Sequence, residues 1–176
     1  KISENSWKIS SFGKHPLFTI KQESIFSLDN GNVVLESGFR KLDILGGLRK
    51  DHQAYKVEKE GDRKKIIYSY GKKEGSIEIE ENFYDNLTLQ VQIKMNFLEK
   101  DQLKINYFDK GKIKIKSFLN IRKEIIYKSK PVEVFELTEQ REDKRYFKFL
   151  IQNDPYKETI KVFQGGRGFN VDWELD

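Results

Sequence analysis

Apolar and polar side chains alternate along most of this chain, and that pattern constrains its fold more than any other feature. Leu87, Leu89, Val91, Ile93 and Met95 alternate with polar residues in the clearest stretch. Alternation with period two predicts a half-buried β-strand. No stretch keeps a 3.6-residue period over three turns. The pattern therefore predicts an all-β chain.

Short turn sequences separate the alternating stretches. Asp29-Asn30-Gly31, Gly61-Asp62 and Asp109-Lys110-Gly111 each predict a hairpin. The strands between residues 55 and 96 are expected to form a four-stranded antiparallel meander that ends with a strand at 87–95. Residues 45–53 are the most loop-like interior segment.

Many short strands at this spacing predict a mostly antiparallel β-sandwich of supersandwich or jelly-roll type. A closed β-barrel is the alternative. We expect residues 1–176 to form a single domain. Ala54 is the only alanine in the chain, which agrees with a β-rich fold because alanine is the best helix former.

Composition excludes several classes of protein. The absence of cysteine removes disulfide frameworks, thiol nucleophiles and thiolate metal sites. No apolar run reaches the ~20 residues of a membrane span, and no leader sequence is visible. The chain begins with Lys1, so we expect it to be processed or excised. Abundant lysine and glutamate without cysteine are typical of proteins from hot habitats, and an AT-rich genome gives a similar excess of lysine, isoleucine and asparagine.

Four lysines alternate along one predicted strand. Lys110, Lys112, Lys114 and Lys116 would share one face and could follow the phosphates of a nucleic acid or another polyanion. The alternative is an edge strand that its lysines protect from aggregation. Lysine far outnumbers arginine, so any nucleic-acid binding would be non-specific.

A second candidate site is the C-terminal stretch GGRGFNVDWELD. Its glycines predict a turn, because a phosphate-binding loop would need a helix after it. Asn170, Asp172 and Glu174 would share one face of the following strand and could converge on a ligand. The string Val171–Glu174 resembles the end of the D-x-x-D-x-D-W-E motif of chitinase-like glycosidases. Two of that motif's aspartates are missing here, so a solvated strand face is the alternative.

Aromatic and histidine side chains offer weaker candidates. Tyr84 and other exposed aromatics could stack against sugar rings, although core packing is the default for such residues. His15 and His52 would need to meet beside a carboxylate to bind a metal. Nothing in their spacing requires this, and we expect neither a metal nor a cofactor.

Residues 55–97, YKVEKEGDRKKIIYSYGKKEGSIEIEENFYDNLTLQVQIKMNF, carry a family resemblance. Their succession of strand, tight turn and charged strand, with an aromatic-Asp turn before a long alternating strand, resembles the supersandwich domain of alpha-galactosidase-like glycoside hydrolases. The resemblance covers about a quarter of the chain and includes no catalytic motif. It implies a non-catalytic β-sandwich that accompanies a catalytic domain.

These patterns favour a binding or accessory module associated with carbohydrate processing. A glycan or a neighbouring catalytic domain is its expected partner, and a membrane is not. One alternative is a basic β-domain that binds nucleic acid or another polyanion. The other is a glycan-acting enzyme that uses Asp172 and Glu174.

Overall fold

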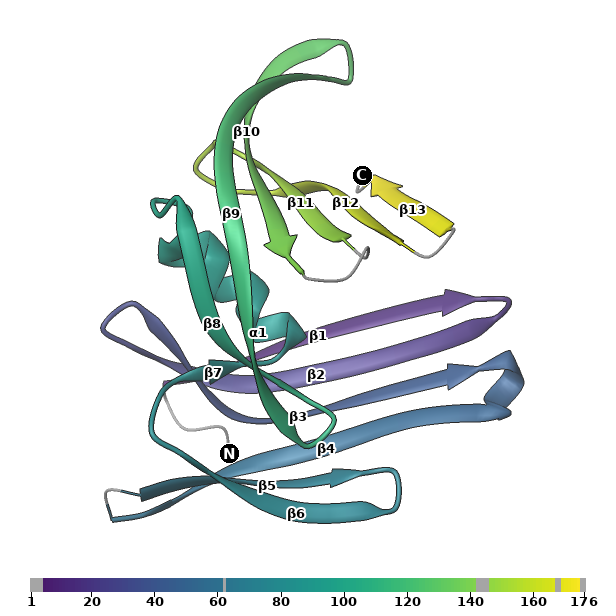
Figure 1. Cartoon of the computed structure of the whole chain (residues 1–176), viewed down its shortest axis with the longest axis vertical. Coiled ribbons are helices and arrows are strands. Elements are labelled where there is room, and N and C mark those ends of the chain that lie inside the picture. The colour runs from purple at the N-terminus through teal and green to yellow at the C-terminus, as the bar shows by residue number, and fades with distance from the viewer. Residues whose placement is uncertain (1–4, 62, 142–145, 167–168, 175–176) are drawn as a thin grey trace. The chain divides into compact units, whose positions relative to one another are not determined.

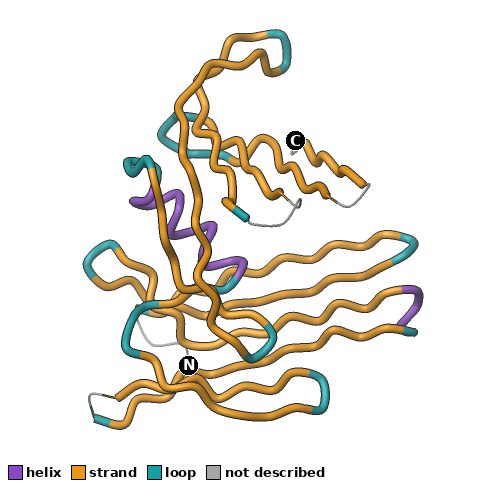
Figure 2. Tube along the Cα trace, viewed as in Figure 1, coloured by secondary structure: helices purple, strands orange, loops and turns teal. Residues whose placement is uncertain are grey.

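A computed structural model describes the backbone of residues 5–61, 63–141, 146–166 and 169–174, with side chains up to residue 163 apart from residue 146. Strands dominate throughout (Figure 2). The chain divides into two compact units. Unit 1 comprises residues 1–96 and 106–114, and unit 2 comprises 97–105 and 115–176.

Unit 1 is built on a six-stranded antiparallel sheet in which each strand pairs with the next (Figure 1). The turn at Asn30-Gly31 has positive φ at both residues, which matches the twist of a two-residue hairpin. A short 3₁₀ turn, η1 (Leu45–Gly47), joins the third strand to the fourth. The strands are β1 (Ser6–His15), β2 (Phe18–Asp29), β3 (Asn32–Ile44), β4 (Arg49–Glu60), β5 (Arg63–Tyr70) and β6 (Lys73–Ile79).

The segment predicted as the last strand of the meander is helical, so that prediction was wrong. Helix α1 (Asn86–Gln92) is followed by a π-helical turn, η2 (Ile93–Phe97). Asp85 caps the helix: its carboxylate accepts the N–H groups of Leu87 and Thr88, and the Thr88 hydroxyl accepts the N–H of Asp85. The alternating leucines are both buried because α1 packs against β1, β2 and β3.

The core of unit 1 lies on one face of the six-stranded sheet. Phe108 is its centre, with edge-to-face ring contacts to Tyr55, Tyr68 and Phe83. Phe83 lies in the two-residue strand β7 (Phe83–Tyr84), which pairs in parallel with β8 (Gln102–Asp109). This aromatic cluster fixes the segment 81–84 over the sheet.

Unit 2 contains an antiparallel run of strands around Val134, Leu150 and Ile160. The sheet order is β13-β12-β11-β10-β9-β8-β7, so β8 and β9 contribute residues to both units. The remaining strands are β9 (Lys112–Tyr127), β10 (Lys130–Gln140), β11 (Tyr146–Gln152), β12 (Thr159–Gly166) and β13 (Phe169–Glu174).

The predicted all-β, mostly antiparallel fold class is confirmed. The strands on either side of Gly61-Asp62 and of Asp109-Lys110-Gly111 pair with each other, as predicted. The predicted loop at 45–53 is wrong in its second half, because β4 already begins at Arg49. No helix in the described ranges is long and apolar enough to cross a membrane.

Candidate binding groove

Strands β3 and β4 pair along only part of their length. Their pairing ends where Ser37 lies opposite Lys56. Beyond that point, residues 33–35 pair only with β2, and residues 57–60 pair only with β5, among the strands that the structure describes. Glu36 is the extra residue of a β-bulge and is skipped in the pairing with β2. Figure 1 shows β3 and β4 running together from η1 and then separating. The sheet of unit 1 is therefore forked.

A hollow of about 700 Å³ lies in this fork. We call it the fork groove. Leu35 and Phe83 form part of its floor and are each only 3% exposed. Its apolar lining consists of Ile25, Val34, Leu35, Val57, Ile79 and Phe83. A volume of this size with a mostly apolar lining is typical of ligand sites.

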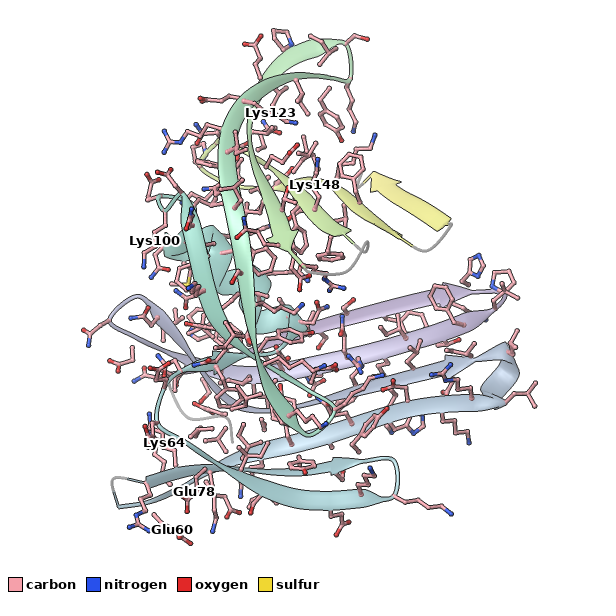
Figure 3. All side chains as sticks on the ribbon, viewed as in Figure 1. Glu60, Lys64, Glu78, Lys100, Lys123 and Lys148 are labelled. Atoms are coloured by element: carbon pink, nitrogen blue, oxygen red, sulfur yellow. The ribbon has the colours of Figure 1, made fainter. Side chains whose placement is uncertain are left out.

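Charged side chains surround the apolar lining. Lys59 and Lys64 lie opposite each other on β4 and β5 and both line the groove. Neither has a carboxylate partner among the described side chains, although like charges directly opposite each other destabilise a sheet. Figure 3 labels Lys64. Two further groove residues are anionic: Glu36 accepts the hydroxyl of Ser6 at 3.0 Å, and Glu81 accepts the amide of Asn106 at 2.9 Å. The two lysines thus offer positive charge to a ligand.

A buried polar network fixes the helix against the sheet of unit 1. Asp85 accepts hydrogen bonds from the hydroxyls of Ser24 and Tyr55, in addition to those that cap α1. Burial and the neighbouring Asp85 carboxylate raise the pKa of Tyr55 well above its usual value. Because Asp85 follows directly after β7, this network also positions Phe83 at the groove floor.

A second polar cluster lies on the same face of the sheet. Arg40 donates to Asp51 at 3.0 Å, and Lys110 lies 2.5 Å from the other Asp51 oxygen. Arg40 Nη1 is also 3.1 Å from Asp109 Oδ1, an ionic contact that is not aligned as a hydrogen bond. Burial opposes ionisation of Asp51, but the bonds from Lys110 and Arg40 outweigh it and lower its pKa. The cluster thus joins β3 and β4 to the β8–β9 turn.

The four lysines of the predicted polyanion face do not share one environment. Lys110 has positive φ in the turn after β8, and its ammonium pairs with Asp51. Lys114 pairs with Asp109 at 3.2 Å, and Lys116 lies 3.6 Å from Glu139 within unit 2. Lys112 is exposed. Carboxylates therefore neutralise much of the positive charge that the alternation predicted.

Tyr84 lies in β7 and is only 5% exposed, and burial raises the pKa of its hydroxyl. Its ring is therefore not available to stack against a sugar. Asn170, Asp172 and Glu174 lie in β13, where Asp172 is opposite Phe163 and Glu174 is opposite Lys161. Their side chains, like residues 167–168 of the predicted glycine turn, fall outside the described part of the chain.

The two histidines have separate partners. His52 Nε2 lies 2.9 Å from Asp43 Oδ1, and the ring of His15 stacks on Phe18 at 5.0 Å. No group of three His, Cys, Asp or Glu side chains in the described portion is arranged to hold a metal ion. His15, Phe18 and Asp43 line another hollow, of about 640 Å³, beside η1.

Sequence reasoning did not find the fork groove. The one available signal was Asp85-x-x-Thr88, a capping pattern that marks the start of α1 and so ends the meander. The β-bulge in the β2–β3 pairing at Ile25 and Phe26 has no comparable signature in the sequence. No protein-family profile, curated protein or solved structure matches this chain.

Proposed function

We propose that this chain is a non-catalytic binding module whose ligand occupies the fork groove. The observation that carries this proposal is the groove itself, about 700 Å³ in volume, with an apolar floor at Leu35 and Phe83 and the cations Lys59 and Lys64 beside it. An apolar floor provides affinity, and a few charged groups fix the orientation of a ligand.

The chemistry of the lining supports binding rather than catalysis. The described lining contains no His, Asp, Cys or Tyr side chain. Its two carboxylates, Glu36 and Glu81, each accept a hydrogen bond from a neutral side chain. A general acid–base mechanism needs a titrating group placed against the reacting atom, and this lining offers no such pair.

The proposed association with carbohydrate processing rests on the resemblance of residues 55–97 to the supersandwich domain. The helical segment from Asn86 to Phe97 departs from the long strand in that resemblance. Tyr84 is buried, so it is not one of the aromatic residues that could stack against a sugar ring. The groove therefore supports a binding module more directly than it supports a glycan as the ligand.

A titration with the fluorescent probe anilinonaphthalene sulfonate, followed by amide NMR, tests the groove as a binding site. We expect saturable binding, with the largest amide shifts at Leu35, Val57 and Ile79. Ser37→Trp, which places a large side chain in the lining, should weaken binding, whereas Ser69→Trp on the neighbouring β5 should not. Shifts confined to the hollow beside η1, or no saturable binding, would contradict the proposal.

A further inference from the structure

We propose that the ligand of the fork groove is an extended peptide that adds as a strand between β3 and β4. This inference rests on the proposed function and specifies its ligand class. Extended peptides bind to free sheet edges through main-chain hydrogen bonds, while their alternate side chains enter pockets. The fork groove offers two such edges in one hollow.

The first edge belongs to β3. The two-residue hairpin pairs Asp29 with Asn32, so in the alternating antiparallel pattern Val34 directs its backbone N–H and C=O toward β2. The backbone groups of Val33 and Leu35 consequently point away from β2, toward the open fork. Residues 33–35 at about 3.3 Å each give this edge a length of about 10 Å before the bulge at Glu36.

One position on this edge already has a partner that substitutes for a strand. The N–H of Val33 donates to the side-chain carbonyl of Gln92, from the end of α1, at 2.6 Å. Gln92 is fully buried, and its side chain also bonds to Asn96. The edge therefore binds an amide carbonyl at one position, and Leu35, two residues along, directs the next pair of groups into the groove.

The second edge belongs to β4. Only two residues separate Glu60 from its partner Arg63, so in the alternating antiparallel pattern Glu58 directs its backbone groups toward β5. Val57 and Lys59 direct theirs away from β5, into the fork. Unpaired N–H and C=O groups along the edge of a strand are a template for pairing with another chain. A strand in the groove would supply partners to both edges.

The side chains around the groove fit a peptide of alternating character. Leu35, Val57 and Phe83 lie on the core face of the sheet, where they would enclose every second side chain. Val34 and Lys56 lie on the opposite face, which is more exposed. The occupant should therefore have aliphatic residues at alternate positions and polar residues between them.

The charges specify one end of this peptide. Lys59 and Lys64 face each other at the end of the β4–β5 hairpin, next to the apolar lining. A carboxylate between them would relieve the repulsion between two cations in register. We therefore assign the acidic end of the peptide, a side-chain or terminal carboxylate, to this position.

An amphiphile with an acyl chain and an anionic head is the main competitor for this groove. It would satisfy the apolar lining and the two lysines. It would leave the backbone groups of Leu35, Val57 and Lys59 without partners, because an acyl chain has no hydrogen-bonding atoms. The forked edges thus favour a peptide.

The test uses the full chain and three probes in fluorescence anisotropy or competition. The first is a labelled peptide that alternates threonine and valine and ends in glutamate with a free carboxylate. The second is the same peptide with N-methyl groups on alternate amides, and the third is dodecanoate. We expect the first peptide to bind and to protect the amides of Leu35 and Val57 from hydrogen exchange. N-methylation should weaken binding by about fivefold or more.

Equal binding of the N-methylated peptide would overturn strand addition, because burial of side chains alone would then explain affinity. Binding of dodecanoate without binding of the peptide would also overturn it and would identify a lipid-like ligand. In both cases, groove-centred shifts with anilinonaphthalene sulfonate would leave the proposed function standing. Failure of that probe and of all three ligands would overturn both proposals.

Two variants of Lys59 separate the contribution of its backbone N–H to peptide binding from the contribution of its charge. Lys59→Pro removes an N–H that points into the fork but leaves the ladder between β4 and β5 intact. Lys59→Gln removes the same charge and keeps the N–H. We expect Lys59→Pro to bind the peptide more weakly than Lys59→Gln, with both variants retaining the wild-type thermal unfolding profile. Equal affinity in the two folded variants would contradict strand addition at β4.

Discussion

The hydroxyl of Tyr55, on β4, donates to the carboxylate of Asp85, the residue that caps α1. This bond joins the sheet of unit 1 to the only α-helix in the described residues. The same carboxylate also accepts from Ser24 on β2. One side chain therefore determines where the helix begins and how it packs on two strands.

We expect Asp85→Asn to destabilise unit 1 by about 3 kcal/mol. The amide can accept hydrogen bonds through only one of its two positions, so it leaves buried donors without partners. Chemical denaturation followed by circular dichroism measures this loss. Asp29→Asn, at the exposed end of β2, is the control and should change the free energy of unfolding little. Equal stability of the two variants would contradict the structural role of Asp85.

The raised pKa of Tyr55 predicts a loss of stability in alkali. The unfolded chain releases the tyrosine proton near pH 10, while the folded chain retains it, so the free energy of unfolding falls as pH rises above about 10. Tyr55→Phe removes this contribution of up to about 1.4 kcal/mol per pH unit. Denaturation of both proteins between pH 8 and about 11.5 compares the slopes. Parallel slopes would show that Tyr55 ionises normally.

Gly38→Ala should be strongly destabilising. A Cβ at this position would lie 2.4 Å from the Tyr55 hydroxyl and 2.7 Å from the backbone oxygen of Glu23. Relief of this overlap would move a buried ring or the β2 backbone, and we expect a cost of about 2–3 kcal/mol. Gly13→Ala, whose nearest neighbour is a side-chain methyl at 3.0 Å, should cost less. Thermal unfolding of the two variants makes the comparison.

The lowered pKa of Asp51 predicts that the protein loses stability in acid. Its pKa is lower in the folded chain, so its stabilising contribution is present above about pH 4 and disappears as pH falls through the folded pKa. Asp51→Asn should cost about 2 kcal/mol at neutral pH, since Arg40 and Lys110 lose their shared partner. The difference from wild type should shrink in acid. Urea denaturation at several pH values tests this, with Asp43→Asn as the more exposed control.

The class of fold was predictable because turn chemistry and alternation agree along most of the chain. The sequence of Asp109-Lys110-Gly111 requires a hairpin, and the structure has positive φ at Lys110 and Gly111. The segment 87–95 was not predictable from alternation. A helix as short as α1 can bury both Leu87 and Leu89 when it is enclosed by β-strands, so its apolar pattern imitates a strand.

The fork groove depends on where the pairing of β3 with β4 ends, which sequence patterns do not encode. Val34 and Glu58 have the alternation of ordinary paired strands, and nothing in their neighbourhood indicates that β3 and β4 separate there. The ionic partners of Lys110 and Lys116 could not be predicted from the sequence either, because Asp51 and Glu139 lie far from these lysines in the chain. The four alternating lysines therefore suggest more unpaired positive charge than the folded chain has, because three of them lie next to carboxylates.

The division of the chain into two interleaved units limits which gene segments could be copied as folding units. Its path changes unit after residues 96, 105 and 114, so neither unit is a continuous stretch of sequence. A gene fusion or duplication that copied only one unit would interrupt β8 or β9. A copy that ended before residue 106 would keep every lining residue of the groove, but it would lose Phe108, whose ring contacts Phe83 in the groove floor.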